Sequence, residues 1–333
     1  METPVRILVI RLTAIGDVVL TLPAISILRQ NFPAAKITFL TTKENAALMQ
    51  GFRDVDETIA LDRAAFRSGN PWRMSGEFFR LLRALRAGKF SLAVDWQANG
   101  ESAWLTRLTG ARRRWGFTKK SSRRWAYTDS LNHPRLHPAE SNCALLRHCG
   151  LAVGEATNNF FLPADALAAA RNFFAANRLL TEKPTLFVQP FTSGAHKNWP
   201  LENYLACARH WRSTGVQIIL GGGPEDRAAL EAARQEGFAI SAGVPLLITG
   251  GLMQLSTLVF GGDTGALHLA VALGKRVLML MHQADTGSPT PFQHHDWVVV
   301  APRPAAIAEI PVAEVIAAGA AALGYNDCQT RKN

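Results

Sequence analysis

The sequence predicts an α/β protein of two domains, each an open parallel β-sheet covered by helices. Short apolar runs of strand length alternate with runs of helical periodicity along the whole chain, which is typical of βαβ units. The pattern starts again near residue 181, and 333 residues suffice for two domains of ordinary size. Polar or glycine-rich loops follow several strand-like runs, at the sheet edge where such proteins bind ligands.

Composition narrows the class of protein. Hydrophobic residues make up 48% of the chain and charged residues 19%, as in a packed globular protein. The formal charge of +10 favours an anionic partner, which could be nucleic acid, an acidic membrane surface or a phosphorylated substrate. Four scattered cysteines without a CxxC motif are expected to be reduced thiols. No uncharged apolar run reaches the roughly 18 residues of a membrane span.

The first half is expected to alternate as follows. Strands are predicted at residues 6–10, 37–40, 58–61 and 92–95. Helices are predicted from the loop at 12–17 to about residue 31, and at 71–87, 138–149 and 166–178. Because proline cannot sit in a helix interior without breaking it, Pro23 means that the first helix starts near Thr21 or kinks there.

The second half repeats the alternation. Strands are predicted at residues 186–188, 216–220, in the run ending at Gly261, and at 276–281 and 297–300. Helices are predicted at residues 201–212, 225–236, near 253–257, and at 266–273 and 312–323. No short fixed-period repeat accompanies this architecture.

The stretch at residues 259–274, VFGGDTGALHLAVALG, organises the second half. It predicts a buried strand, a glycine turn and a helix whose N-cap is Asp263 or Thr264. Such a turn points free N–H groups and a positive helix end at one place, which suits a phosphate. Gly265 lets an anion approach the backbone, and His268 follows three residues later. An ordinary βα turn with a capping Asp explains the same pattern.

Two further loops place polar side chains after predicted strands. Thr192 and Ser193 precede Lys197 by five and four residues, and hydroxyls with an ammonium suit a pyrophosphate, although a plain polar loop has the same composition. Glu225 follows Gly221–Gly223 and could bind ribose hydroxyls or simply match a helix dipole.

Asp17 follows Gly16 at the end of the first loop. As the carboxylate at the mouth of the N-terminal sheet, it could act as a general base or only cap a helix. Asp54-Val-Asp56 and His294-His295-Asp296 lack the surrounding ligands of a metal site, so no metal site is predicted.

A basic segment lies between the fourth strand and the helix at 138–149. Its cations are Arg112, Arg113, Arg114, Lys119, Lys120, Arg123 and Arg124, interleaved with Trp115, Phe117 and Trp125. A solvated loop explains such a run, and so does an electrostatic landing site for an anionic acceptor. Nucleic acid uses the same residue types, but no nucleic-acid motif accompanies them.

Taken together, these loops resemble glycosyltransferase family 9, the heptosyltransferases that build the lipopolysaccharide inner core, over nearly the whole chain. ILVIRLTAIGDVVLTLPAISILRQNFP is similar to the family's N-terminal segment, TSGAHKNWP to its donor loop, and PEDR to the segment with its nucleoside-binding acid. The most specific match is DTGALHLAVALG.

The resemblance implies a GT-B fold, with two Rossmann-like domains whose parallel sheets face a central cleft. Residues 1–180 would form the N-terminal acceptor-binding domain and residues 181–310 the C-terminal nucleotide-sugar-binding domain. Residues 311–333 would form a terminal helix that packs back on the N-terminal domain.

It further implies an inverting, metal-independent transfer of heptose from ADP-heptose to a Kdo- or heptose-bearing lipid A core, with no other cofactor. Asp17 would be the catalytic base. Donor-binding residues would be Thr192, Ser193, Lys197, Glu225, Asp263, Thr264, Gly265 and His268. Lys197, His268 and the N–H groups around Thr264 would stabilise the leaving diphosphate, and Asp263 would hold sugar hydroxyls. Acceptor-binding residues would be Lys119, Lys120, Arg123 and Arg124.

The implied partners are a nucleotide sugar and an anionic glycolipid, with no nucleic acid. The protein would be cytoplasmic and make peripheral contact with the inner face of the inner membrane. One segment departs from the family pattern: a Gly-Pro-Thr-Asp-Pro-like run is replaced by His282-Gln-Ala-Asp-Thr286. A relative using another nucleotide sugar or a protein acceptor, a non-catalytic nucleotide-sugar binder and a basic nucleic-acid-binding protein are the alternatives.

Overall fold

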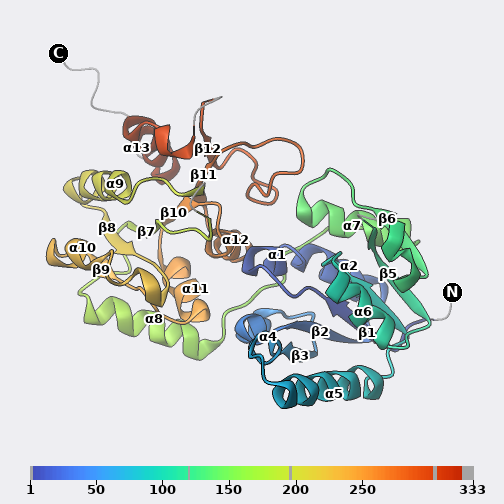
Figure 1. Ribbon diagram of the computed structural model, residues 1–333. Helices are drawn as coiled ribbons and strands as arrows, with labels where there is room; N and C mark the ends of the chain where they lie inside the picture. The colour runs from blue at the N-terminus through green and yellow to red at the C-terminus, as the bar shows by residue number, and fades with distance from the viewer. Residues whose placement is uncertain (1–2, 119–120, 195–196, 303–305, 325–333) are drawn as a thin grey trace. The chain divides into compact units, whose positions relative to one another are not determined.

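The computed structural model describes residues 3–118, 121–194, 197–302 and 306–324. The chain divides into two compact units between Phe161 and Leu162 (Figure 1). Each unit contains one six-stranded sheet in which all strand pairs are parallel. Within these residues, no helix combines the length and the apolar character that a bilayer span requires.

The first unit is a doubly wound sheet. Its strands are β1 (Arg6–Ile10), β2 (Lys36–Thr42), β3 (Glu57–Leu61), β4 (Leu92–Asp95), β5 (Arg113–Thr118) and β6 (Asp129–Asn132). Its helices are α1 (Ile15–Val19), α2 (Leu22–Asn31), α3 (Lys43–Ala46), α4 (Arg63–Arg67), α5 (Pro71–Ala87), α6 (Gly100–Leu108) and α7 (Pro138–His148), with 3₁₀ turns η1 (Ala47–Gly51) and η2 (Ser121–Ala126). The strand order is β3-β2-β1-β4-β5-β6, so the direction of winding reverses between β1 and β4.

The second unit repeats this plan. Its strands are β7 (Thr185–Gln189), β8 (Gln217–Leu220), β9 (Ala239–Ile240), β10 (Leu258–Gly262), β11 (Val277–Met281) and β12 (Val298–Val300). Its helices are α8 (Ala164–Ala176), α9 (Leu201–Ser213), α10 (Glu231–Gln235), α11 (Leu246–Leu255), α12 (Gly265–Ala272) and α13 (Val312–Leu323), with 3₁₀ turns η4 (Pro224–Asp226) and η5 (Ile307–Glu309). The order β12-β11-β10-β7-β8-β9 reverses between β7 and β10.

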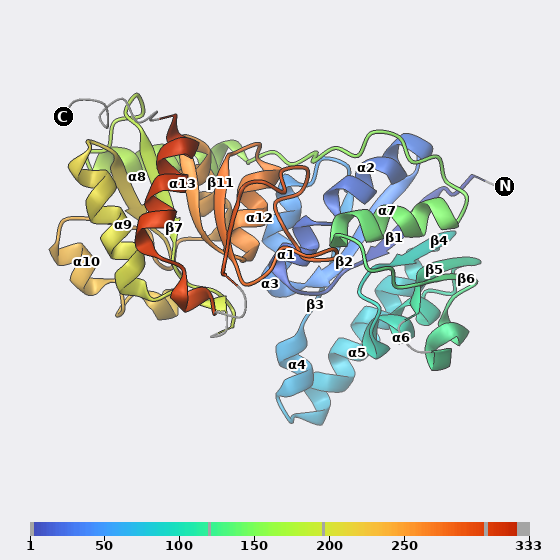
Figure 2. The same ribbon diagram turned by 90° about the horizontal axis from the view of Figure 1, so that it is seen from above.

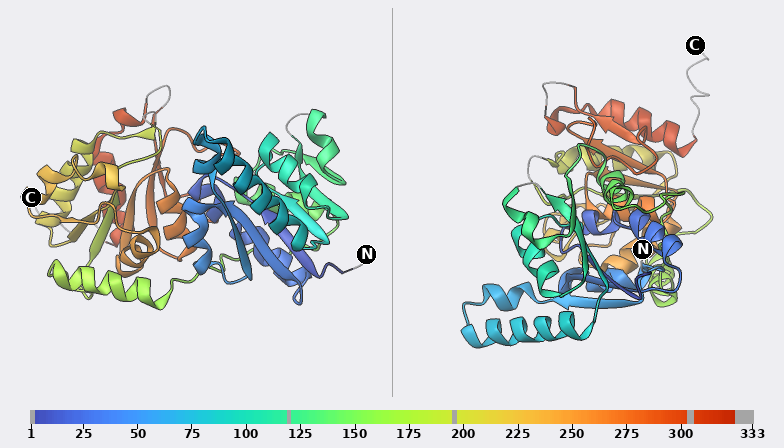
Figure 3. Two further views of the ribbon diagram at one scale, coloured as in Figure 1. Left: turned by 60° about the horizontal axis from the view of Figure 1, so that its bottom comes forward. Right: turned by 90° about the vertical axis from the view of Figure 1, so that its right-hand side faces the viewer.

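Both sheets are covered on both faces, as all-parallel sheets require. In the first unit, side chains of α5 and α6 join Leu8, Ile10 and Leu40 in one core, and α2 packs on α7 elsewhere in the unit (Figure 2). In the second unit, α9 and α13 cover one side of the sheet, and α8 packs against α11 (Figure 3). The continuous apolar strands of the sequence are therefore buried strands.

The domain boundary lies earlier than the expected residue 180. Helix α8 belongs to the second unit because it packs along α11, where Gly251 is so close to Ala170 that a Cβ would meet it at 2.8 Å. The described residues of the terminal helix α13 pack within the second unit, and packing on the first domain stays a prediction. Val315 is buried in the core of the second unit, and Gly319 faces the Trp211 ring of α9.

The basic segment is not the loop that its charges suggested. Residues Arg113–Thr118 form strand β5, which lies between β4 and β6, and its Trp115 and Phe117 are each 1% exposed. The aromatic residues interleaved with the arginines are thus core residues, except Trp125, which is 45% exposed. Pro23 lies in the first turn of α2, so the predicted first helix is two helices that break at Leu20 and Thr21.

Candidate active site

The reversal point of the second sheet brings two predicted loops together. β7 and β10 are hydrogen-bonded neighbours, and the loops that follow their carboxyl ends carry Lys197 and Asp263. Open parallel sheets bind ligands at such a reversal point, because the two loops leave on opposite faces and open a crevice between them. The fold therefore places these loops where the sequence analysis expected a nucleotide.

Asp263 is the centre of this constellation. Its Oδ2 atom accepts a hydrogen bond from Lys197 Nζ at 2.5 Å, and its Oδ1 atom lies 3.2 Å from His268 Nε2. Since a carboxylate only accepts hydrogen bonds, Nε2 carries the proton of this contact. The Asp263 side chain is 12% exposed and that of His268 is 3% exposed. Asp263 and His268 are therefore held in a fixed geometry. Lys197, the third residue of the group, is the most accessible to solvent.

The pKa of Asp263 reflects two opposing effects. Burial, the larger single effect, would raise this pKa by disfavouring the charged form. The hydrogen bond and positive charge of His268, followed by those of Lys197, oppose it and together hold the pKa of Asp263 below its ordinary value. Asp263 is thus a stable anion at neutral pH.

Helix α12 starts directly beside Asp263. Thr264 is its N-cap, and the Thr264 hydroxyl oxygen accepts from the Leu267 N–H at 3.4 Å. The remaining N–H groups of the first turn, from Gly265 onward, have no intrahelical acceptor and lie at the positive end of the helix dipole. The prediction of a strand, a glycine turn and a helix is confirmed, with Thr264 rather than Asp263 as the cap. Asp263 is left free to pair with Lys197.

Two glycines make this close arrangement possible. A Cβ on Gly261 would lie 2.4 Å from the backbone oxygen of Gln189 in β7. A Cβ on Gly262 would lie 2.7 Å from the Thr192 methyl group. The glycines therefore let the end of β10 approach the loop after β7, and they bring Lys197 within reach of Asp263.

The predicted hydroxyls of the loop after β7 behave differently from each other. Thr192 is engaged inside the loop: its hydroxyl lies 2.6 Å from Asn198 Oδ1 and 2.9 Å from the Gly194 carbonyl oxygen. Thr192 therefore shapes the loop that carries Lys197. Ser193 is exposed. Whether either hydroxyl contacts a diphosphate stays a prediction.

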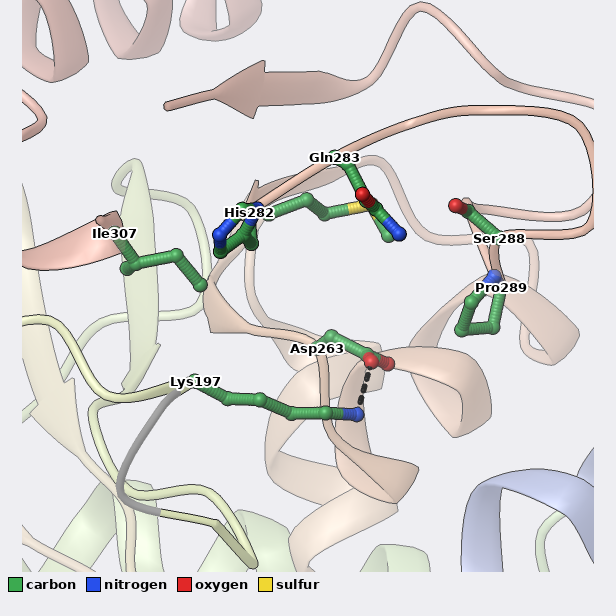
Figure 4. Close-up of a pocket in the computed structure, with 8 residues that line it drawn as sticks. Lys197, Asp263, His282, Gln283, Ser288, Pro289 and Ile307 are labelled. Carbon is green, nitrogen blue, oxygen red and sulfur yellow. Dashed lines mark hydrogen bonds and ion pairs between the residues drawn. The ribbon is translucent and has the colours of Figure 1, made fainter. Parts of the chain in front are cut away.

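A cavity of about 350 Å³ opens next to Lys197 and Asp263, entirely within the second unit. Figure 4 shows Lys197 and Asp263 on one side of this cavity and side chains of the segment after β11 on the other. The lining residues are Lys197, Asp263, Met281, His282, Gln283, Ser288, Pro289 and Ile307. His282 and Gln283 belong to the segment that departs from the family pattern, so the departure lies beside the candidate site.

Glu225 follows β8, the neighbour of β7 in the sheet. It is exposed in the 3₁₀ turn η4, and its carboxylate folds back within 2.4 Å of where a Cβ of Gly223 would lie. The predicted helix at 225–236 is wrong, because a 3₁₀ turn and the short helix α10 take its place. Glu225 lies at the same sheet edge as Lys197 and Asp263, although no contact joins it to them.

The reversal point of the first sheet holds Asp17. Asp17 lies in α1 after β1, is 38% exposed, and pairs through Oδ2 with Arg11 Nη2 at 2.7 Å. The same oxygen accepts from the Ala14 N–H at 3.2 Å. The structure therefore places Asp17 both as an accessible carboxylate and as a first-turn acceptor, so the catalytic and the capping interpretations are compatible.

Residues after β4 hold the Asp17 loop in place. The Gln97 side-chain oxygen accepts from the N–H groups of Leu12 and Thr13 at 2.8 and 3.1 Å, and Arg11 donates to the Trp96 carbonyl. The sequence analysis assigned no role to Gln97. The signal was its position after β4, since β1 and β4 flank the reversal point.

The predicted acceptor residues are only partly described. Lys119 and Lys120 lie outside the described residues. Arg123 donates to the Ala98 carbonyl at 3.1 Å and is half-buried, so it has a structural contact of its own. Arg124 is exposed on η2. In the described part of the chain, no three His, Cys, Asp or Glu side chains are grouped as metal ligands would be.

The sequence was compared with protein families and with curated proteins. Residues 78–309 match glycosyltransferase family 9 (heptosyltransferase). The chain is 24% identical to lipopolysaccharide heptosyltransferase 3 of Escherichia coli over 81% of each chain, and 26% identical to lipopolysaccharide heptosyltransferase 1 of Pseudomonas aeruginosa over 85% of this chain and 80% of that one.

Solved structures show the same fold. The family 9 glycosyltransferase of Veillonella parvula superposes with a TM-score of 0.85 at 19% identity, over 98% of this chain and 99% of that one. E. coli heptosyltransferase WaaC with ADP-2-deoxy-2-fluoro heptose superposes with a TM-score of 0.75 at 19% identity, over 93% and 97% of the two chains. The two Rossmann-like units with parallel six-stranded sheets form a GT-B fold, and the family match makes the protein a glycosyltransferase. More particularly, the chain belongs to glycosyltransferase family 9 (heptosyltransferase).

Proposed function

We propose that this protein transfers heptose from ADP-heptose to an inner-core acceptor, a Kdo- or heptose-bearing lipid A, with inversion at the anomeric carbon and without a metal ion. The observation that carries the proposal is the Lys197–Asp263–His268 constellation at the start of α12, beside a cavity of about 350 Å³. An ammonium group and free helix N–H groups suit a diphosphate, and a fixed carboxylate suits sugar hydroxyls.

The chemistry follows from these groups. As the bond between sugar and diphosphate breaks, negative charge grows on the diphosphate. Lys197 and the N–H groups of Thr264 and Gly265 stabilise that charge, which lowers the barrier because the charge is larger in the transition state than in the bound donor. Asp263, oriented by His268, holds the sugar. Asp17 removes the proton of the acceptor hydroxyl, since a neutral hydroxyl is a poor nucleophile.

The positive charge of the chain supports binding of an anionic acceptor. The chain carries a formal charge of +10, and the acceptor is an anionic glycolipid with phosphates and carboxylates. Arg124 and its neighbours in the basic segment contribute to its capture, and the enzyme works in peripheral contact with the inner face of the inner membrane.

Lys197→Ala tests the donor site. Losing one charge-assisted contact to a diphosphate costs about 2–3 kcal/mol, or roughly 30- to 150-fold in affinity. Isothermal titration of ADP into wild type and variant measures it, with Lys183→Ala as the matched control because Lys183 is an exposed lysine before β7, away from the cavity. Equal ADP affinities for wild type and Lys197→Ala would show that Lys197 is only a surface lysine.

The reaction itself is tested with a panel of nucleotide sugars and a lipid A core acceptor. We expect transfer from ADP-heptose, with an inverted anomeric configuration by NMR and unchanged turnover after chelation of metal ions. Transfer from a different nucleotide sugar only would overturn the assigned donor, and loss of turnover on chelation would overturn metal independence.

One observation favours a different nucleotide sugar as the donor. His282 and Gln283 line the cavity in a segment where the family usually has a different sequence. The alternative function is transfer of another sugar by the same machinery, and thermal shifts with ADP-heptose and other nucleotide sugars separate the two. A larger shift with another sugar nucleotide supports the alternative.

A further inference from the structure

The outer face of α5 is unusual for a helix of an α/β unit. Of the large hydrophobic side chains that are exposed among the described residues, four lie in its first half. Trp72 and Phe79 are on the outer face, whereas Met74 and Phe78 are on the side of the buried Leu81. Trp72 is 85% exposed and Phe79 is 64% exposed, although aromatic side chains this large are normally buried. Such a cluster indicates an interaction surface.

Helix α5 has a buried face that packs on the sheet and an outer face that is exposed to solvent. Leu81 and Leu85 are buried in the core of the first unit, and Glu77 is buried beside them, where it accepts from the Asp62 N–H and pairs with Arg80. This inner face fixes the helix on the sheet. It leaves the other face available for a partner (Figures 1 and 2).

Helical spacing collects the aromatic and basic residues on that free face. Trp72, Phe79, Arg83 and Arg86 are separated by seven, four and three residues, so they lie along one side of the helix, opposite Leu81. Pro71 and the Asn70 cap start the helix, with Asn70 Oδ1 accepting from the Trp72 N–H at 3.0 Å, so the Trp72 position is defined.

The charge of α5 is strongly positive. The helix has a formal charge of +3 over 17 residues, because it contains one acid, Glu77, and four arginines, Arg73, Arg80, Arg83 and Arg86. Because Glu77 is buried and paired with Arg80, the exposed surface presents only arginines beside the aromatic rings. A helix with aromatic residues and arginines on its outer face matches the interface of an anionic bilayer, where rings enter the headgroup region and arginines meet phosphates.

We propose that the outer face of α5, formed by Trp72, Phe79, Arg83 and Arg86, docks the enzyme on an anionic phospholipid surface. The inference rests on the proposed lipid-linked acceptor, since it says which surface brings the first unit to that acceptor's membrane. The charge complementarity between arginines and lipid phosphates selects a bilayer over a neutral apolar partner.

Vesicle cosedimentation of the full chain tests the proposal, with phosphatidylcholine vesicles that contain or lack phosphatidylglycerol. The wild type is expected to bind the anionic vesicles, and less well as salt increases. Trp72→Ser/Phe79→Ser should weaken binding at least about tenfold. Arg83→Gln/Arg86→Gln should weaken it about 30-fold, since each arginine near an anionic surface contributes roughly a factor of five, and should flatten the salt dependence.

Arg171→Gln/Lys183→Gln is the matched control, because it removes the same charge from exposed positions outside α5. It is expected to bind vesicles as the wild type does. Quenching by brominated lipid gives a second measurement: Trp72→Phe should lose most of the quenching while still binding. Both α5 variants change exposed side chains only, so their melting temperatures should match the wild type.

Three results would overturn the proposal: no wild-type binding to anionic vesicles, equal binding by both α5 variants and wild type, or a wild-type dimer by light scattering that Trp72→Ser/Phe79→Ser dissociates. The last would assign the face to a second copy of the chain. Transfer to a soluble acceptor fragment separates this test from the proposed function. If wild type transfers the sugar to the soluble fragment but does not bind vesicles, the docking proposal fails and the proposed function stands. If wild type binds vesicles but does not use ADP-heptose, the proposed function fails and the docking surface stands.

Discussion

Asp17 combines accessibility with a defined position. Arg11 and the Ala14 N–H fix its Oδ2 atom, and the side chain remains 38% exposed. The ion pair is partly buried, since the Arg11 side chain is 15% exposed, but Arg11 keeps the Trp96 carbonyl as a second acceptor. Removing the negative charge of Asp17 should therefore affect chemistry far more than folding.

Asp17→Asn is the sharpest test of the base. Asn keeps the size and the acceptor oxygen for the Ala14 N–H but cannot take a proton. We expect kcat to fall by about 10²–10⁴-fold, with ADP binding unchanged and the melting temperature within a few degrees. Steady-state kinetics, titration of ADP and thermal unfolding measure the three quantities. Near-normal turnover would leave Asp17 with a capping role only.

Asp263 should make stability depend on pH. Its pKa is lowered in the folded protein, so its charged form stabilises the fold above the unfolded pKa, near 3.9. That contribution is lost as pH falls through the folded value. Asp263→Asn should therefore be less stable than wild type at neutral pH, and the difference in free energy of unfolding should narrow below about pH 4.

Urea unfolding at neutral and acid pH measures this difference. Asp129→Asn is a suitable control, because Asp129 is exposed on β6, far along the chain from the site. A difference between wild type and Asp263→Asn that is the same at both pH values would mean that the Lys197 and His268 contacts do not stabilise the ionised form.

At the scale of elements, the junction of β7 and β10 decides whether the proposed donor site forms. Gly261→Ala would put a Cβ 2.4 Å from the Gln189 backbone oxygen, which cannot move without shifting β7. Overpacking of this kind costs about 1–3 kcal/mol, and it separates the loop of Lys197 from Asp263. We expect lower stability together with weaker ADP binding.

Gly76→Ala provides the matched control. Gly76 is exposed in the middle of α5, and a Cβ there meets nothing within 4 Å. Because glycine is less favourable than alanine in a helix interior, this variant should gain about 0.5–1 kcal/mol and bind ADP normally. Chemical unfolding and ADP titration of both variants check the pair. A Gly261→Ala variant as stable as wild type would mean that β7 and β10 can separate freely.

The same scale shows where sequence patterns mislead. Arg112, Arg113 and Arg114 precede Trp115 and hide the alternation of strand β5, so the sequence indicates only a solvated loop or an electrostatic landing site there. The strand forms because Trp115 and Phe117 are buried on the sheet, whereas the arginines occupy its partly exposed beginning. Helix α11 was predicted too short for a related reason: it is apolar on nearly all sides, so it has no amphipathic period to detect.

For the whole molecule, the proposed donor site lies in one unit and the proposed base in the other. Saturating ADP at about 100 times its dissociation constant adds about 2.7 kcal/mol to the free energy of unfolding of the unit that binds it. Calorimetry should therefore show the same ADP-dependent rise in unfolding temperature for wild type and Asp17→Asn, and a much smaller one for Lys197→Ala at that concentration. Loss of the rise in Asp17→Asn would contradict this division.

The sequence by itself determined the alternation of strands and helices, the two sheets, and the strand-end loops that hold Asp17, Lys197 and Asp263. These are local properties, because apolar runs, glycine turns and cap residues act over a few positions. The tertiary structure alone decided what those residues touch. The order of strands made β7 and β10 neighbours across some 70 residues of chain, and this paired Lys197 with Asp263.

Packing between distant segments also decided the unit boundary and the free face of α5. Helix α8 could join either unit by its sequence, and its fit against α11 assigned it to the second. Helical spacing puts Phe78, Leu81, Leu82 and Leu85 on one apolar face of α5, but only Leu81 and Leu85 are fully buried. Which hydrophobic side chains stay exposed depends on how much of the helix the sheet covers, and that is a property of the folded unit rather than of the sequence period.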